Sequence, residues 1–297
     1  MGFSSPNWKV EDVTGDAAAD LTISGQITNA NALTKTGVGT MVISGNNTYT
    51  GGTNANEGVL QVSSIADAGG IGSIGTGYLG VANDGTFRYT GTGTETSARN
   101  LWIDTGAQNK TIEVASATGD ITFSGTGGNI NKPFTKTGLG ALTLADVIDV
   151  GATVTVNGGK LTLTGVNTYT GTTTVSTGTL VIDEGSIASS SGIVNNAALE
   201  YKLTTNARTY SNVISGTGSL TKTGTNTLTL GGANTYTGNT VVNSGTLALA
   251  DNAQLKFVLG ASSGSSNSLS GAGTATLDGD FVIDTTAADA LASGSWT

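Results

Sequence analysis

Apolar residues and threonines alternate with a period of two through much of the chain, in runs of three to five residues that end at glycine or at Asn-Gly. The stretch Thr153–Leu163, TVTVNGGKLTL, shows both the alternation and the interrupting glycines. Alternation at this period places every second side chain on one face of a strand, which predicts short strands with one buried face. Because the many threonines, glycines, serines and asparagines favour helices poorly, the pattern predicts an all-β protein.

Two short strings each occur three times along the chain. TKTG follows an apolar residue at Thr34–Gly37, Thr135–Gly138 and Thr221–Gly224. NTYTG comes after it at Asn47–Gly51, Asn167–Gly171 and Asn234–Gly238. The apolar residue and the asparagine lie 14 positions apart in the first and third copies and 33 apart in the middle copy, which therefore carries 19 additional residues.

These additional residues form a module of their own. When the middle copy is compared with itself at an offset of 19 residues, Leu142–Leu144 aligns with Leu161–Leu163, and Thr153–Leu163 aligns with Thr172–Ile182. A chain that gains such a module without disturbing its flanks is typical of a solenoid, in which each coil contacts only its neighbours. Coils of about 19 residues, stacked about 4.8 Å apart, predict roughly 14–16 coils in a rod about 70 Å long.

Composition narrows the chemistry that is available. The chain has no cysteine and no histidine, which excludes disulfides, thiolate metal sites, imidazole ligands and histidine-based nucleophile pairs. A net charge of −9, with 12 Lys and Arg in total, argues against nucleic-acid binding, because that affinity depends on clustered cations. The 46 glycines suit a fold that must turn a corner several times in every coil.

The stretch Leu33–Val62, LTKTGVGTMVISGNNTYTGGTNANEGVLQV, resembles the autotransporter-associated β-strand repeat, also called the passenger-associated transport repeat. The copies that begin at Phe134 and Leu220 are similar to it. The resemblance implies a single-domain parallel β-helix, or β-solenoid, with right-handed coils. It also implies a rod-like stalk or adhesin scaffold on or outside a Gram-negative-type cell, which supports secretion through an outer-membrane translocator in the parent protein and has neither catalytic residues nor a cofactor.

The recurring residues of the two strings are expected to be structural, as the resemblance implies: Gly37, Asn47, Tyr49, Gly51, Gly138, Asn167, Tyr169, Gly171, Gly224, Asn234, Tyr236 and Gly238. From the residues alone, the asparagines either hydrogen-bond within a turn and join neighbouring coils or contact a ligand. The tyrosines either pack at a corner or form an aromatic platform for surface glycans. Packing is favoured, because the chain between successive tyrosines is long enough to place them several coils from one another.

The expected domain organisation is an N-terminal lead-in or cap over residues 1–20, followed by a continuous β-helix over 21–297 with repeat copies near 33–62, 134–183 and 220–251. Residues 1–20 contain neither the basic region nor the apolar region of a signal peptide. The chain ends at Ser295–Thr297, within an expected strand. It is therefore expected to be a fragment of a longer exported protein, truncated at its C-terminus.

Two alternatives from other functional classes remain open. The first is a β-helical polysaccharide-active enzyme, which would need paired carboxylates in a cleft, or a glycan-binding module. Asp278, Asp280 and Asp284 are close in sequence and are weak candidates for a calcium site. An ice-binding solenoid would need threonine ranks on a flat face, but the Thr-rich runs do not recur at one coil position.

The uncapped ends of a solenoid also predict end-to-end self-association.

Overall fold

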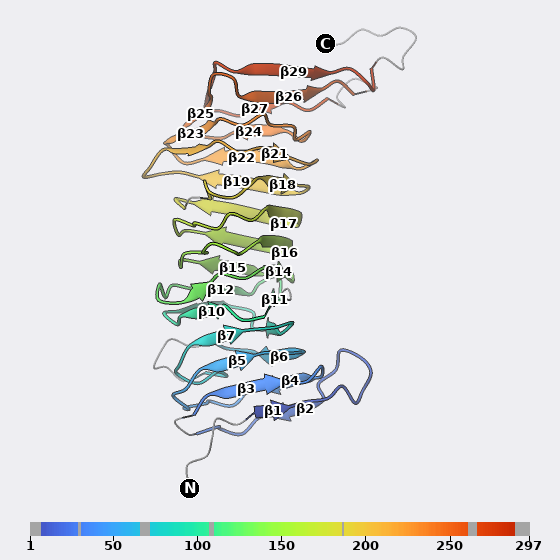
Figure 1. The fold of residues 1–297 in the computed structure, drawn as a ribbon, viewed down its shortest axis with the longest axis vertical. Coiled ribbons are helices and arrows are strands. Elements are labelled where there is room, and N and C mark those ends of the chain that lie inside the picture. Colours follow the sequence, from blue (N-terminus) through green and yellow to red (C-terminus); the bar gives the residue numbers. More distant parts are fainter. Residues whose placement is uncertain are drawn as a thin grey trace.

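The computed structural model describes residues 7–28, 31–65, 72–106, 110–185, 187–260 and 266–288. These residues form 29 strands and no helix, so none of the described segments could cross a membrane as an apolar helix. Strands follow one another along the long axis of the molecule, with β1 near one end and β29 at the other (Figure 1). The expected strand end at Ser295–Thr297 lies outside the described residues.

The strands belong to four sheets. The first contains β1 (Asn7–Lys9), β3 (Leu33–Thr36), β5 (Thr53–Ala55), β7 (Leu79–Val81), β10 (Leu101–Ile103) and β13 (Asn129–Ile130). The second and largest contains β2 (Leu21–Ile23), β4 (Thr40–Ile43), β6 (Val59–Val62), β8 (Thr86–Tyr89), β9 (Thr94–Ser97), β11 (Lys110–Val114), β12 (Asp120–Phe123), β14 (Phe134–Thr137), β15 (Ala141–Leu144), β16 (Val154–Leu163), β17 (Thr173–Asp183), β18 (Ile193–Asn195), β19 (Ala198–Lys202), β21 (Ile214–Ser215), β22 (Ser219–Thr223), β24 (Thr240–Val242) and β27 (Leu269–Ser270). The third contains β20 (Arg208–Tyr210), β23 (Thr227–Leu230), β25 (Thr246–Leu249) and β28 (Thr274–Leu277), and the fourth β26 (Gln254–Val258) and β29 (Asp280–Asp284).

All strand pairs within these sheets are parallel, which confirms the predicted β-solenoid. The shift between modules read from the sequence is the register between β16 and β17, where Leu161 pairs with Leu180. Other turns contain more residues than this one. Asn54 on β5 pairs with Gly80 on β7, and Thr240 on β24 pairs with Leu269 on β27, so the paired residues are further apart in sequence than Leu161 and Leu180. The 19-residue module is therefore one of the shorter turns. If every turn had its length, the chain would complete more turns than it does.

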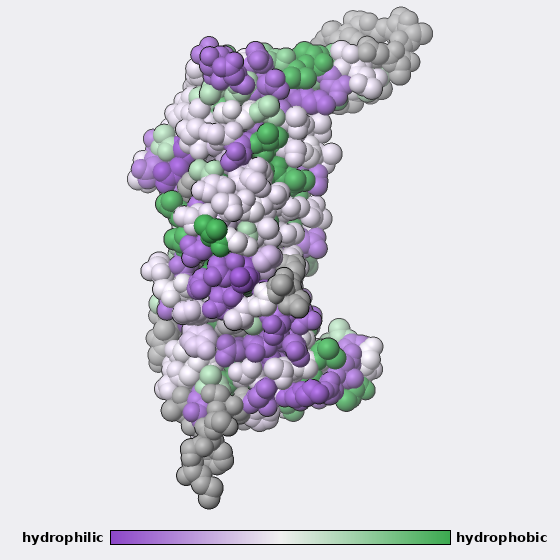
Figure 2. Space-filling view, viewed as in Figure 1, coloured by the Kyte–Doolittle hydropathy of each residue, from purple (hydrophilic) through white to green (hydrophobic). Residues whose placement is uncertain are grey.

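The core consists of ladders of apolar side chains, one from each turn. Leu142, Leu161, Leu180 and Leu199 occupy equivalent positions on β15, β16, β17 and β19, and each is at most 1% exposed. Stacking identical side chains removes apolar surface from water at every step, at roughly 25 cal/mol per Å² buried. The outward positions between them hold threonine and other polar residues, and Figure 2 shows a largely hydrophilic to neutral visible face with hydrophobic residues in separate patches.

Candidate functional site

Each TKTG string places a lysine inside the coil. The alternation of Leu33-Thr34-Lys35-Thr36 turns Leu33 and Lys35 inward, and Lys35 is fully buried. Lys136 and Lys222, the corresponding residues of the other two strings, are fully buried as well. A buried ammonium group is costly unless it is hydrogen-bonded, so the contacts of these side chains decide whether the corner is stable.

Each lysine ammonium group donates hydrogen bonds to three backbone carbonyl oxygens. We call this arrangement the lysine clamp. Lys136 Nζ donates to the carbonyl oxygens of Thr137 at 2.8 Å, Gly138 at 3.3 Å and Gly158 at 3.2 Å. The same pattern binds Lys35 to Thr36, Gly37 and Glu57, and Lys222 to Thr223, Gly224 and Ser244. The third carbonyl lies 22 residues further along in every copy, so each clamp joins two turns.

Burial lowers the pKa of all three lysines, and for Lys136 it brings the pKa to about 8 despite the opposing charge of Glu113. The glycine that ends each string is required by the backbone. Gly37 and Gly138 both have φ +77°, and Gly224 has φ +75°, a region that side chains with a Cβ rarely adopt. A Cβ on Gly224 would also lie 2.2 Å from the Leu203 carbonyl oxygen.

The recurring asparagines join neighbouring turns in the same way in each copy. The Oδ1 atoms of Asn47, Asn167 and Asn234 accept hydrogen bonds from the backbone N–H of Ile27, Ile148 and Ile214, which lie 20, 19 and 20 residues earlier. Their Nδ2 groups donate to backbone carbonyls, and all three side chains are buried. These amides therefore satisfy backbone groups inside the rod, and a ligand could not reach them without opening the coil.

The recurring tyrosines are buried as well. The hydroxyl groups of Tyr49, Tyr169 and Tyr236 each bond a threonine hydroxyl four residues on, at 2.6, 2.7 and 2.6 Å. Their exposed fractions are 1%, 0% and 0%, and burial raises the pKa of each phenol, that of Tyr236 to about 12. A glycan cannot reach these rings. The glycines that follow are packed against backbone: a Cβ on Gly51, Gly171 or Gly238 would lie 2.2–2.4 Å from atoms of the preceding turn.

Two kinds of motif residue have structural roles that were not predicted from the sequence. The clamp lysines lie within the repeated string but were not assigned a role, and Thr53, Thr173 and Thr240 were not linked to the tyrosines. The signal for the lysines was present: a charged residue recurs three times at an inward position of the two-residue alternation.

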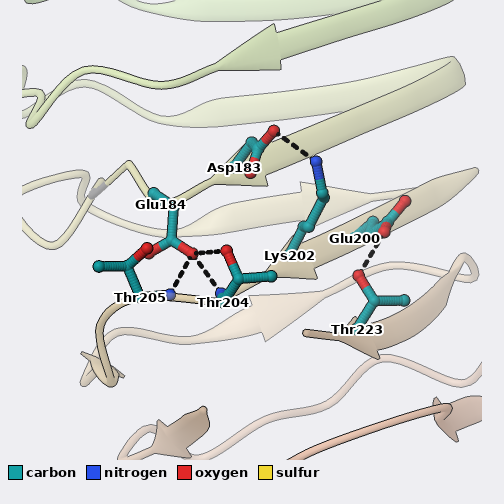
Figure 3. A network of polar contacts seen from close by, with 7 residues as sticks. All are labelled: Asp183, Glu184, Glu200, Lys202, Thr204, Thr205 and Thr223. Carbon is teal, nitrogen blue, oxygen red and sulfur yellow. Dashed lines mark hydrogen bonds and ion pairs between the residues drawn. The ribbon is translucent and has the colours of Figure 1, made fainter. Parts of the chain in front are cut away.

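Carboxylates also join turns on the surface (Figure 3). Glu184 accepts hydrogen bonds from the backbone N–H of Thr204, Thr205 and Asn206 and from the Thr204 hydroxyl. Partial burial raises the pKa of the Glu184 carboxyl, but these donors outweigh it and bring the pKa down to about 2. Next to it, Lys202 Nζ lies 2.9 Å from Asp183 Oδ2 across the same pair of turns (Figure 3).

The structure does not gather the proposed calcium ligands into one site. Asp284 forms an ion pair with Lys256, at 2.8 Å between Oδ2 and Nζ, and its Oδ1 accepts a hydrogen bond from the backbone N–H of Thr286. Hydrogen bonds from Lys256 and Thr286 lower the pKa of Asp284. Asp278 and Asp280 are exposed. Across the described ranges, no three Asp or Glu residues are grouped so that they could hold a metal ion.

A groove of about 430 Å³ crosses the first sheet over β3, β5, β7 and β10. Among the described residues that line it, Asp104 alone carries a carboxylate. Glycoside hydrolysis generally uses two carboxyl groups about 5–10 Å apart, one as acid and one as base or nucleophile. The residues that line this groove supply only one of the two.

Comparison with known proteins links the chain to a repeat family and to one adhesin. The Passenger-associated-transport-repeat family matches it three times, at residues 33–62, 154–182 and 220–249. The chain is also 33% identical over 246 residues to the adhesin BmaC autotransporter of Brucella suis biovar 1 (strain 1330). That alignment covers 71% of this chain and 7% of the adhesin. No solved structure matches the chain.

Proposed function

Because the chain belongs to the Passenger-associated-transport-repeat family, we propose that it is a non-catalytic structural segment of an exported bacterial surface protein, forming a rod-like stalk or adhesin scaffold. The observation that carries this proposal is the repeated corner, in which a lysine clamp, an asparagine and a tyrosine–threonine pair recur in all three copies. Every one of these groups is used within the rod, so the motif stabilises stacking.

The proposed setting of the segment is supported by the adhesin that it resembles. The chain spans about 7% of the length of the adhesin that it matches, so it corresponds to one part of a much longer surface protein. In the proposal the parent protein carries an outer-membrane translocator, the rod lies outside a Gram-negative-type cell, and the repeats support its secretion. The absence of cysteine suits this route, since disulfides formed early would obstruct a chain that is threaded unfolded.

Surface display tests the structural role. The full chain is fused between a signal peptide and an outer-membrane translocator, and display is measured by protease accessibility on intact cells. We expect efficient display, and a marked loss when all three clamp lysines are replaced by glutamate, because the coils can then no longer bury these positions. Unchanged display of the triple variant would contradict a role for the repeats in secretion.

A catalytic role is tested separately from display. The purified chain is incubated with polygalacturonate, alginate and a neutral β-glucan, and reducing ends are measured over time. We expect no release above the blank, because the groove lining supplies one carboxylate and catalysis would need two. Turnover of any of these polymers would overturn the non-catalytic proposal.

End-to-end self-association is a further part of the proposal. β29 pairs with β26 alone among the described strands, and its Phe281, Val282 and Ile283 side chains are 47%, 38% and 54% exposed. An apolar strand with an open edge is a template for a second chain. Light scattering is expected to show a mass that rises with concentration and falls back in Ile283→Lys, with Thr143→Ala on a distant strand as control. A monomer over the whole concentration range would refute the association.

A further inference from the structure

The groove across the first sheet results from one glycine in an outward rank. The parallel register aligns Thr34, Asn54, Gly80 and Trp102 on β3, β5, β7 and β10. Asn54 and Trp102 both carry large side chains on the outer face, and Gly80 between them carries none. The Asn54 side chain leans over this glycine, because a Cβ on Gly80 would lie 2.3 Å from Asn54 Oδ1. The slot therefore has the Asn54 amide on one side and Trp102 on the other, with Gly80 beneath.

Two aromatic rings form one side of this slot. Tyr78, just before β7, is 39% exposed, and its ring lies 6.0 Å from the Trp102 ring, centroid to centroid, at an interplanar angle of 58°. Tyr78 also packs over Gly52, where a Cβ would come within 2.3 Å of the ring. The two rings thus present a partly exposed apolar surface. The other aromatic side chains of this region, Phe87 and Tyr89, are fully buried.

The opposite side and the ends of the slot are polar. Asn54, Asn56, Asp104 and Thr105 supply amide, carboxylate and hydroxyl groups to the lining. Asn54 Nδ2 makes a long contact of 3.4 Å with Thr34 Oγ1, which leaves most of its hydrogen-bonding capacity available. None of the lining residues is a lysine or arginine, and the whole chain carries a net charge of −9. An anionic ligand would therefore be repelled.

We propose that this groove binds a neutral glycan, with one pyranose ring placed against Tyr78 and Trp102 and its hydroxyl groups bonded to the asparagines and Asp104. Sugars combine an apolar C–H face with a rim of hydroxyls, and aromatic side chains beside amide and carboxylate groups match both parts. A volume of about 430 Å³ lies within the usual range of small-ligand sites, about 300–1,000 Å³. This function goes beyond the structural role of the rod and does not depend on it, because the clamp lysines, the recurring asparagines and the tyrosine–threonine pairs are not among the residues that line the groove.

The test uses the full chain labelled with ¹⁵N, in which the indole N–H signal of Trp102 is assigned by its disappearance in Trp102→Phe. The probes are maltohexaose, cellohexaose, mannohexaose and N-acetylchitohexaose. We expect at least one of them to shift the Trp102 signal in a saturable way. Trp102→Ala, followed by calorimetry, is expected to weaken binding at least tenfold, and Gly80→Leu to abolish it by filling the slot. Thr143→Ala, an outward substitution on β15, serves as the control and is expected to bind as the unaltered chain does.

Several results would overturn the proposal. One is the absence of any shift with all four oligosaccharides at millimolar concentration. Another is binding that persists in both Trp102→Ala and Gly80→Leu while their melting temperatures match that of the unaltered chain. Tighter binding of polygalacturonate, or of a proline-rich peptide, than of every neutral oligosaccharide would assign the groove to a different ligand. If Gly80→Leu fails to fold, the comparison of Trp102→Ala with Thr143→Ala decides.

Discussion

At the scale of single residues, the three motif copies bury lysine, asparagine and tyrosine side chains whose polar groups are hydrogen-bonded within the rod. The lysine clamp replaces what a disulfide or a metal ion provides in other small coils: a specific link between two turns. It differs from an apolar ladder because an ammonium group requires acceptors at defined places, whereas one leucine packs against another in many ways. Each TKTG copy contributes one such link, together with the asparagine that bonds the preceding turn.

The clamp can be tested by removing the ammonium group while keeping its bulk. In Lys136→Met the carbonyl groups of Thr137, Gly138 and Gly158 lose their common donor inside the rod. Unsatisfied buried acceptors cost about 1–3 kcal/mol, so we expect the free energy of unfolding to fall by about that amount in denaturant titrations. Lys160→Met, at an exposed position on β16, is the control and should leave stability nearly unchanged. Equal stability of both variants would show that the clamp contributes nothing.

The acidic corner around Glu184 predicts a dependence on pH. The pKa of this carboxyl is about 2 in the folded protein against an ordinary value of 4.5, so the unfolded chain binds more protons between these values. Its contribution to stability is complete above pH 4.5 and disappears as the pH falls towards 2. We expect the melting temperature of Glu184→Gln to fall less steeply over this window than that of the unaltered chain. Asp251→Asn, in an exposed turn, should follow the unaltered chain. Parallel curves for all three would contradict the assignment.

At the scale of strands and turns, the repeated module was predictable from sequence because it recurs side chain for side chain. The alignment of Leu142 with Leu161 and of Leu161 with Leu180 is the register found between β15, β16 and β17. The longer turns elsewhere could not be predicted, because their extra residues lie in corners without a repeated pattern. The groove was missed for the same reason: Asn54 and Trp102 lie on turns of unequal length, and only the register brings them to either side of Gly80.

Removal of one whole turn tests the module directly. Deletion of residues 154–172 joins Thr153 to Thr173 and places β17 on β14 and β15 in the register that β16 now holds. We expect a protein with a single cooperative thermal transition whose largest dimension in solution scattering is shorter by about 4.8 Å. Deletion of residues 154–163 alone removes about half a turn and should abolish the cooperative transition, because it shifts inward side chains out of the core. If both deletions melt alike, turns are not the structural unit.

At the scale of the whole molecule, stability comes from contacts between adjacent turns. The chain has no cysteine, and the described residues group no three acidic side chains around a metal site. We therefore expect the melting temperature to stay within about 1 °C on addition of EDTA, calcium or a reducing agent, since a ligand that does not bind the folded state cannot stabilise it. A rise in melting temperature with calcium, lost in Asp280→Asn, would restore the acidic cluster near β29 as a metal site.

The spacing of the lysine clamps also bears on how a repetitive chain avoids errors in assembly. Turns of similar length and sequence can be stacked one position too early or too late, and leucine ladders alone would tolerate the mistake. A clamp is more selective, because its ammonium group needs a carbonyl oxygen at a defined place in the next turn, which in all three copies comes from the residue 22 places ahead. A turn stacked in the wrong order leaves an ammonium group buried with part of its acceptors missing. Each of the three lysines thus adds a cost of about 1–3 kcal/mol to a stack that leaves its ammonium group without an acceptor.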